Sequence, residues 1–216
     1  MPDVPDLHPP IPQRLLWRGD DLPAGAGRLA LSAAVENELD RIVAALDRDP
    51  LPLLLLRPED FTLDASRAFM REVKRSLVDG PGFAIVDRLP VERWSQSGAR
   101  AVWWLLASLV SRPVAQKWDG TSVYDVCDLG RPPGNGVRPD VTNAEQNFHT
   151  DNSYNHVPPH YVGLLCLRTA MEGGVSGIVS FAAAHEKMRQ HIPTCCPDSI
   201  SRSISTGSAS TRRATS

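Results

Sequence analysis

The sequence lacks any long apolar run, any large excess of charge of one sign and any regular spacing of cysteines. No apolar segment approaches the roughly 20 residues that a helix needs to cross a bilayer, so we expect no membrane-spanning segment. The start of the chain is acidic and rich in proline, unlike the basic and apolar regions of a signal peptide. The formal net charge is only −2, which indicates neither a nucleic-acid partner nor binding to an anionic membrane surface.

Cysteine is scarce, with four residues in a chain of 216. Cys127 and Cys166 lie in separate apolar segments, and Cys195 and Cys196 are adjacent near the end of the chain. Neither pair has the spacing of a zinc finger, and no secretory context favours a framework of disulfide bonds. We therefore expect a soluble, cytoplasmic protein with reduced thiols. Nothing in the sequence indicates its oligomeric state.

The first half of the sequence predicts three helices after an irregular arm. Residues 1–28 are rich in proline and glycine and predict the arm. Ser32 can cap a helix that Asp49 and Pro50 end, and two further helices are expected over residues 63–78 and 91–110. Their apolar residues keep helical spacing: Val35, Leu39, Ile42 and Leu46, then Phe69, Val73 and Leu77, then Trp94, Val102, Leu105, Leu106 and Leu109. Trp103 and Trp104 are expected to pack the third helix against a sheet.

The second half of the sequence predicts short strands. After a strand at residues 83–87, strand patterns appear at residues 114–129, 161–167 and 177–181, and a short helix is expected over residues 182–190. The continuously apolar residues 161–167 are typical of a strand buried on both faces. Between these strands, residues 131–145 predict a long loop, either the rim of a site or a disordered connection. Helices followed by many short strands indicate an α+β chain whose catalytic core is all-β.

His149 and Asp151 are the candidate metal ligands. They lie two residues apart in a segment whose Phe148, Thr150 and Tyr154 suit an extended strand. Residues i and i+2 of a strand point to the same face, so an imidazole nitrogen and a carboxylate oxygen would project side by side. This pair is two-thirds of the two-histidine, one-carboxylate triad that holds non-haem Fe(II) and leaves coordination positions open. The triplet alone also fits a polar surface strand.

The residues that follow extend this pattern. Pro158 and Pro159 form a turn, residues 161–167 an apolar strand, and residues 173–176 the element Gly-Gly-Val-Ser. In this order and spacing, the sequence resembles the taurine dioxygenase-like (TauD/TfdA) family of Fe(II)- and 2-oxoglutarate-dependent dioxygenases. The resemblance implies a double-stranded β-helix (jelly roll) core with flanking N-terminal helices, in a domain that spans residues 29–192.

The resemblance also implies a reaction, in which 2-oxoglutarate is oxidised to succinate and CO2 while O2 hydroxylates a small-molecule substrate. Fe(II) would be held by His149, Asp151 and a second histidine. Ser176 stands where the family has a hydroxyl residue that hydrogen-bonds a carboxylate of 2-oxoglutarate, although a turn residue of a glycine-rich hairpin fits this position equally well. Asn152 and Tyr154 follow the ligand segment, where they could touch substrate or support the ligands.

The second histidine of the family comes from a late strand, and an arginine after it pairs with the other carboxylate of 2-oxoglutarate. His185 and His191 lie near a short helix instead, so we assign this role to neither. Two alternatives remain open. One is a non-catalytic remnant or binding protein that keeps the scaffold. The other is a cupin-type jelly roll that binds a metal through His149 together with His156 or His160.

The resemblance stops near residue 192. Residues 193–216 are nearly half serine or threonine and have almost no apolar periodicity, which is typical of a disordered tail. A shifted reading frame of the same stretch can encode a peptide with an amphipathic helix and aromatic residues, similar to the continuation of the family. We therefore hypothesise that a frameshift replaced the C-terminal part of the core with this aberrant tail. Such a chain is expected to fold poorly and to turn over little.

Overall fold

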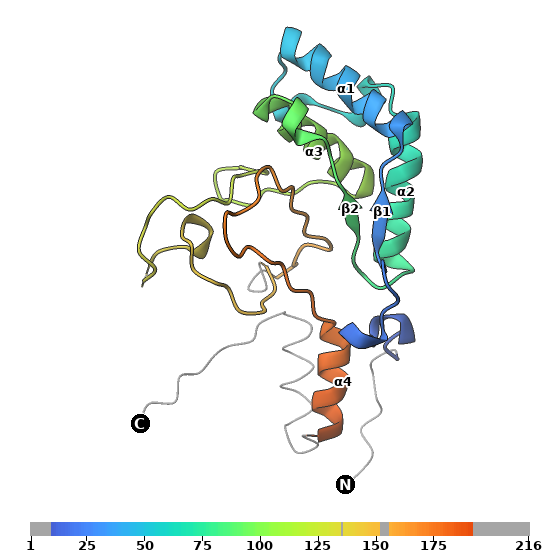
Figure 1. Ribbon diagram of the computed structural model, residues 1–216, viewed down its shortest axis with the longest axis vertical. Coiled ribbons are helices and arrows are strands. Elements are labelled where there is room, and N and C mark those ends of the chain that lie inside the picture. Colours follow the sequence, from blue (N-terminus) through green and yellow to red (C-terminus); the bar gives the residue numbers. More distant parts are fainter. Residues whose placement is uncertain (1–9, 135, 152–155, 192–216) are drawn as a thin grey trace.

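The computed structural model describes residues 10–134, 136–151 and 156–191, and it has two unlike regions (Figure 1). The first is a helical body of α1 (Ala33–Arg48), α2 (Asp64–Val78) and α3 (Gln96–Val110), with a small parallel sheet of β1 (Arg28–Ala30) and β2 (Ile85–Asp87). The second region is formed by residues 111–180. Its irregular segments lie to one side of the helices and lead into α4 (Phe181–His191). The expected α+β class is confirmed.

The helices form where apolar spacing and capping residues coincide. The Ser32 side chain accepts a hydrogen bond from the amide of Val35 at the start of α1, at 3.4 Å. The start of α3 differs from the sequence-based prediction, because Ser95 caps the amide of Gly98 at 2.9 Å and the helix begins at Gln96. Residues 91–93 form a separate turn of 3-10 helix before that cap.

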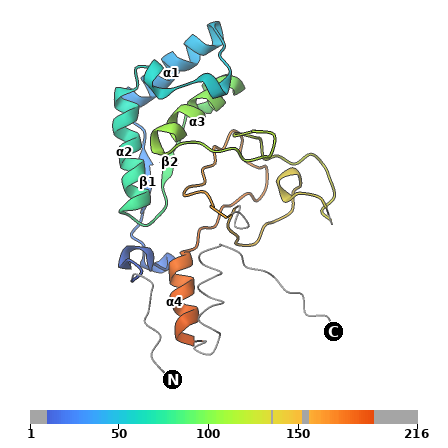
Figure 2. The ribbon, with the colours of Figure 1, turned by 180° about the vertical axis from the view of Figure 1, so that it is seen from behind.

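One apolar core holds the three long helices together. Their apolar faces meet in a cluster whose buried side chains include Leu39, Met70 and Leu105. Two opposite views show α1 and α3 side by side, with α2 next to the sheet (Figure 2). All the buried apolar side chains lie between Val35 and Val110, among the residues that the structure describes. The stability of the described chain therefore comes from its first half.

The two tryptophans of α3 pack in different directions. Trp104 is buried in the helical core, and its indole Nε1 donates to the carbonyl of Leu56 at 3.0 Å. The ring of Trp103 lies against Gly163, where an added Cβ would come within 2.7 Å of it. The prediction that both residues pack α3 against a sheet is therefore wrong, because the segment around Gly163 forms no strand among the residues that the structure describes.

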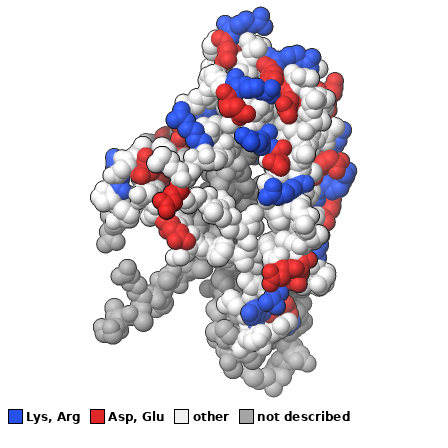
Figure 3. Space-filling view, in the orientation of Figure 1, with Lys and Arg blue, Asp and Glu red and all other residues white. Residues whose placement is uncertain are grey.

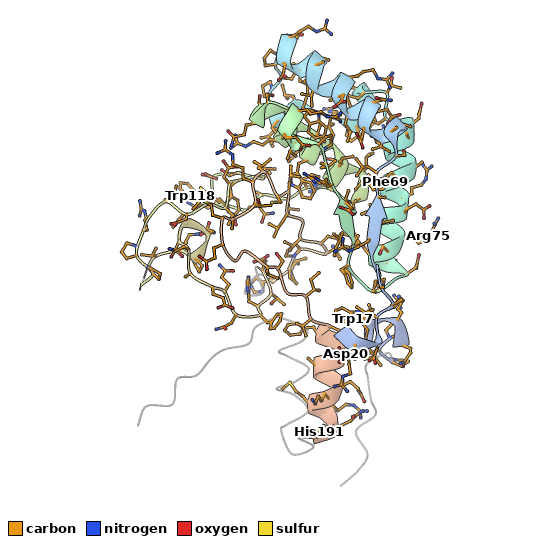
Figure 4. All side chains as sticks on the ribbon, in the orientation of Figure 1. Trp17, Asp20, Phe69, Arg75, Trp118 and His191 are labelled. Carbon is orange, nitrogen blue, oxygen red and sulfur yellow. The ribbon has the colours of Figure 1, made fainter. Side chains whose placement is uncertain are left out.

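The arm before β1 is more ordered than its composition predicts. Two 3-10 turns, Gln13–Leu15 and Gly19–Asp21, place it against the end of α2. The Arg14 guanidinium donates to the carbonyl of Val78 at 2.7 and 3.1 Å, and the Trp17 indole donates to the carbonyl of Pro81 at 2.8 Å (Figure 4). These bonds satisfy carbonyls that the end of a helix and its turn leave unpaired.

Most strands predicted for the second half do not form among the described residues. Residues 114–129, 161–167 and 177–180 contain no strand, and residue 181 already begins α4. Residues 116–119 form a bend and a turn, and the amides of Cys127 and Leu129 donate to the carbonyls of Asp140 and Val141, each at 3.1 Å, without forming a strand. Instead of being buried on both faces, Val162 and Leu164 are 58% and 77% exposed. An apolar strand requires neighbouring strands and a covering layer, and the described residues supply neither. The short helix expected at residues 182–190 is confirmed as α4, and β2 confirms the last three residues of the strand expected at 83–87.

The buried carboxylate of Glu38 joins α1 to α2. It accepts hydrogen bonds from the amides of Ala65 and Ser66, each at 2.8 Å, and from the Ser66 hydroxyl at 2.7 Å. The residue before α2, Leu63, has no side chain that can cap the helix. The side chain of Glu38, which belongs to α1, takes the place of a local cap. Burial alone would raise the pKa of Glu38, but these hydrogen bonds outweigh it and hold the pKa below its ordinary value.

Replacing Glu38 by glutamine is expected to lower the free energy of unfolding at pH 7 by about 1–3 kcal/mol. The amide NH2 of glutamine would face the donors of Ala65 and Ser66 and could not accept their hydrogen bonds. Because the folded pKa is depressed, the contribution is complete above the unfolded pKa and is lost as pH falls through the folded pKa. Urea denaturation at pH 7 and at pH 3 measures both effects. The exposed Glu92→Gln change is the control. An equal loss at both pH values would contradict the role of the charge.

Candidate metal site

The His-x-Asp pair lies in the irregular region, between a bend at Phe148 and a turn at Asp151. The expected strand does not form there, yet the two side chains are still adjacent, with His149 Nε2 3.6 Å from Asp151 Oδ1. Both are about half exposed, at 52% and 51%, so they are accessible to an ion from solvent. The i, i+2 spacing is therefore enough to bring the two groups together without a sheet.

A backbone contact sets the tautomer of the neutral His149 ring. Its Nδ1 lies 2.8 Å from the carbonyl oxygen of Asn147, and because a carbonyl can only accept, Nδ1–H is the donor. In the neutral ring this tautomer leaves the lone pair on Nε2, the nitrogen beside Asp151. Histidines that bind metals are commonly oriented in this way by a hydrogen bond from the other nitrogen.

The pair fits a divalent metal in part. Two donor atoms on neighbouring positions of an octahedral ion, each at about 2.1 Å, lie roughly 3 Å apart. The observed 3.6 Å needs only a small side-chain adjustment, and a nitrogen with a carboxylate oxygen suits Fe(II). Within the described ranges, no third His, Cys, Asp or Glu joins His149 and Asp151 to make a larger group.

Ser176 lies beyond a glycine turn and is exposed. Gly173 and Gly174 have φ values of +73° and +70°, in the left-handed region that glycine adopts without strain. The chain then passes beside Phe148, because a Cβ added to Gly177 would lie 3.1 Å from Phe148 Cε1. The segment that carries Ser176 is thus a neighbour of the segment that carries His149. The candidate substrate residues Asn152 and Tyr154 lie outside the described residues.

The other histidines of the described region do not complete the site. His156 and His160 are exposed, and His160 lies next to the ring of Tyr161, with centroids 6.4 Å apart. His191 Nδ1 donates to the carbonyl of Lys187 at 2.8 Å within α4. His185 Nδ1 is buried and has no hydrogen-bond partner among the described residues. None of these four forms a group of three ligands with the His149–Asp151 pair.

The sequence shows no sign of one surface groove, which is open and has a volume of about 380 Å³. It lies between α3, the chain at residues 51–56 and the start of the irregular region. An ion pair of Arg100 and Asp125 crosses it. Its lining residues are Leu51, Leu53, Leu56, Ser97, Arg100, Ala101, Val123, Tyr124 and Asp125. No candidate site residue lines this groove. No local signal could have found it, because its walls come from three separate parts of the chain.

Neither positive nor negative side chains dominate the visible face. Lysine and arginine side chains alternate with aspartate and glutamate over the helical body (Figure 3). Of the helices that the structure describes, none has both the length and the apolar character needed to span a membrane.

Comparison with known families identifies the chain. The family model described as "Taurine catabolism dioxygenase TauD, TfdA family" matches residues 47–203, more than half of the chain. The match runs past residue 192 into the stretch expected to be an aberrant tail. No curated protein matches the chain. Members of the matched family are generally dioxygenases that use Fe(II) and 2-oxoglutarate. By this match, the chain belongs to the taurine catabolism dioxygenase TauD, TfdA family.

Proposed function

We propose that this chain carries the site of an Fe(II)- and 2-oxoglutarate-dependent dioxygenase that hydroxylates a small molecule and releases succinate and CO2. The observation that carries the proposal is the adjacency of His149 Nε2 and Asp151 Oδ1 inside the segment matched by the family. We also assign it to the reducing cytoplasm, in keeping with the free, exposed thiols of Cys127 and Cys166.

Each residue of the site has a distinct role. His149 Nε2 and the Asp151 carboxylate would hold the metal, and the hydrogen bond from Nδ1 to Asn147 keeps the imidazole in the ligating tautomer. The Ser176 hydroxyl would donate to a carboxylate of 2-oxoglutarate. Asn152 and Tyr154 would contact the substrate. Bound Fe(II) and 2-oxoglutarate together supply the activation of O2, so the chain's own task is to bind and orient them.

We propose further that residues 29–192 are an incomplete jelly-roll domain, and that the second histidine and the arginine are encoded in a shifted frame. The support is the distribution of apolar side chains: Phe148, Leu164 and Val175 are 70%, 77% and 93% exposed, as expected where covering strands are missing. Sequencing the source DNA from codon 185 onward tests this proposal. We expect an open shifted frame that encodes a histidine followed by an arginine, and the absence of such a frame would refute it.

A non-catalytic binding protein is the second candidate. It is favoured by one observation, that the described residues offer only two adjacent ligands. Two protein ligands leave most coordination positions to solvent or 2-oxoglutarate, which predicts weak metal binding and little turnover. A cupin-type site with His156 or His160 has no such support in the described geometry.

Anaerobic calorimetric titration with Fe(II), with and without 2-oxoglutarate, separates these candidates. The dioxygenase proposal predicts metal binding that 2-oxoglutarate tightens at least about fivefold, the lower range of ordinary coupling between sites. Metal binding indifferent to 2-oxoglutarate would favour a cupin-type site. The absence of metal binding would leave the binding-protein candidate and refute the proposed dioxygenase site.

A further inference from the structure

The ring of Phe148 and the backbone of Gly177 meet across 29 positions of sequence. A Cβ added to Gly177 would lie 3.1 Å from Phe148 Cε1 and 3.3 Å from Cζ, closer than side chains normally approach. Glycine therefore lets the ring rest directly on the backbone. Phe148 is nevertheless 70% exposed, so this contact is not part of an apolar core. It joins two irregular segments of the described chain.

The position of the contact gives it a functional meaning. Phe148 is bonded directly to His149, and Gly177 is bonded directly to Ser176. A displacement of the ring from Gly177 would thus move the metal-binding segment relative to the segment of the candidate cosubstrate anchor. Gly173 and Gly174, shortly before Ser176, have φ values of +73° and +70°, which glycine adopts without strain.

We propose that Phe148 and Gly177 are positioning residues, which set the spacing between the His149–Asp151 pair and Ser176 so that one 2-oxoglutarate molecule reaches both. This inference rests on the proposed function. The 2-oxo acid end of the molecule would lie at the metal, and the distal carboxylate would accept the hydrogen bond of Ser176. Neither Phe148 nor Gly177 has to touch the cosubstrate.

Widening the contact tests the inference. In Gly177→Leu the added Cβ would lie 3.1 Å from Phe148 Cε1, so the ring has to shift by at least a few tenths of an ångström, and the branched end of leucine adds further bulk. Gly134→Leu places the same side chain where no atom lies within 4 Å of an added Cβ. We expect Gly177→Leu to weaken 2-oxoglutarate binding to the metal-loaded protein about tenfold, the loss expected from one hydrogen bond to a charged group. Metal binding without 2-oxoglutarate should change less than about twofold, because both ligands remain.

A shorter ligand shows whether the distal anchor is involved. 2-Oxobutyrate has the chelating 2-oxo acid group and no distal carboxylate, so its affinity should be the same in the unmodified protein and in Gly177→Leu. Equal weakening of both ligands would mean that the substitution damages the metal end instead, and would overturn the inference. Unchanged binding of 2-oxoglutarate in Gly177→Leu would overturn it as well.

A readout without metal tests the contact itself. The protons of Gly177 lie near the face or edge of an aromatic ring, so Phe148→Leu should shift their NMR resonances and leave those of the helical body unchanged. Unmoved Gly177 resonances would refute the contact even in a protein that binds Fe(II) and 2-oxoglutarate. If the unmodified protein binds neither, the proposed function fails, and the positioning role fails with it whether or not the resonances shift.

Discussion

Replacing Asp151 by alanine is expected to abolish measurable binding of Fe(II). Asp151 supplies the only carboxylate next to His149 in the described geometry, at 3.6 Å, and a lone imidazole holds Fe(II) poorly. The affinity should fall at least about a hundredfold. Losing a residue that only hydrogen-bonds to a metal ligand can already cost up to about that much, and Asp151 would be a ligand itself. Anaerobic calorimetry in the presence of 2-oxoglutarate measures this loss.

Glu145→Ala is the matched control for that experiment. Glu145 is an exposed acid in the same segment, so its removal changes the local charge equally and leaves the His149–Asp151 pair intact. We expect this variant to bind Fe(II) within about twofold of the unmodified protein, because exposed charges at this distance are largely screened. If both variants lose binding equally, the metal is attracted by general negative charge and Asp151 is not a ligand.

Limited proteolysis of the 216-residue chain is expected to cut first within residues 111–180 and to leave a resistant fragment that contains α1, α2 and α3. The buried apolar side chains of the described chain lie between Val35 and Val110, whereas Trp118 projects from the irregular region and is 99% exposed (Figure 4). Segments with few buried contacts open at little cost in free energy, so proteases reach them first. Mass spectrometry of the fragments over time gives the order of cleavage.

Two leucines provide a matched pair for this prediction. Leu105 is fully buried, and Leu105→Ala should destabilise the helical body by about 2–5 kcal/mol and make the fragment sensitive to protease. Leu164 is 77% exposed, and Leu164→Ala should leave the pattern of cleavage unchanged. Early protection of residues 161–167, or sensitivity in Leu164→Ala, would show that this segment is a packed strand and would contradict the described arrangement.

The helical body could be predicted from the sequence because its signals are local. Apolar spacing and the cap at Ser32 define helices within one or two turns of chain. The cap at Ser95 was not predicted, and the third helix begins at Gln96 instead of the expected residue 91. The pairing of β1 with β2 could not be predicted in the same way. Residue 28 pairs with residue 85, and no local pattern records a partner so far along the chain.

The strands of the second half show the opposite error. Residues 161–167 have the composition of a buried strand, but composition states only what the segment would do beside a partner. The described residues offer no such partner, so the segment forms no strand and is largely exposed. The α+β class follows from the residues described, and the jelly roll is a proposal that rests on the family match.

The candidate site divides in a similar manner. The i, i+2 spacing predicted that His149 and Asp151 would be adjacent, and they are, at 3.6 Å, although no strand forms at these residues. The hydrogen bond between His149 and the carbonyl of Asn147 could not be predicted, because the sequence does not show where a carbonyl points at a bend. The approach of Gly177 to Phe148 was equally hidden, because it joins distant segments.

Paramagnetic NMR with Mn(II) tests the central claim most directly, since this ion shares the charge and octahedral preference of the proposed metal. Added to the isotope-labelled full chain with 2-oxoglutarate, it broadens the amide signals of residues near the bound ion. The account predicts loss of signals at residues 147–151 and 173–177, while those of α1, α2 and α3 stay sharp. Broadening centred on any other part of the chain, or none at all, would contradict a metal site at His149 and Asp151.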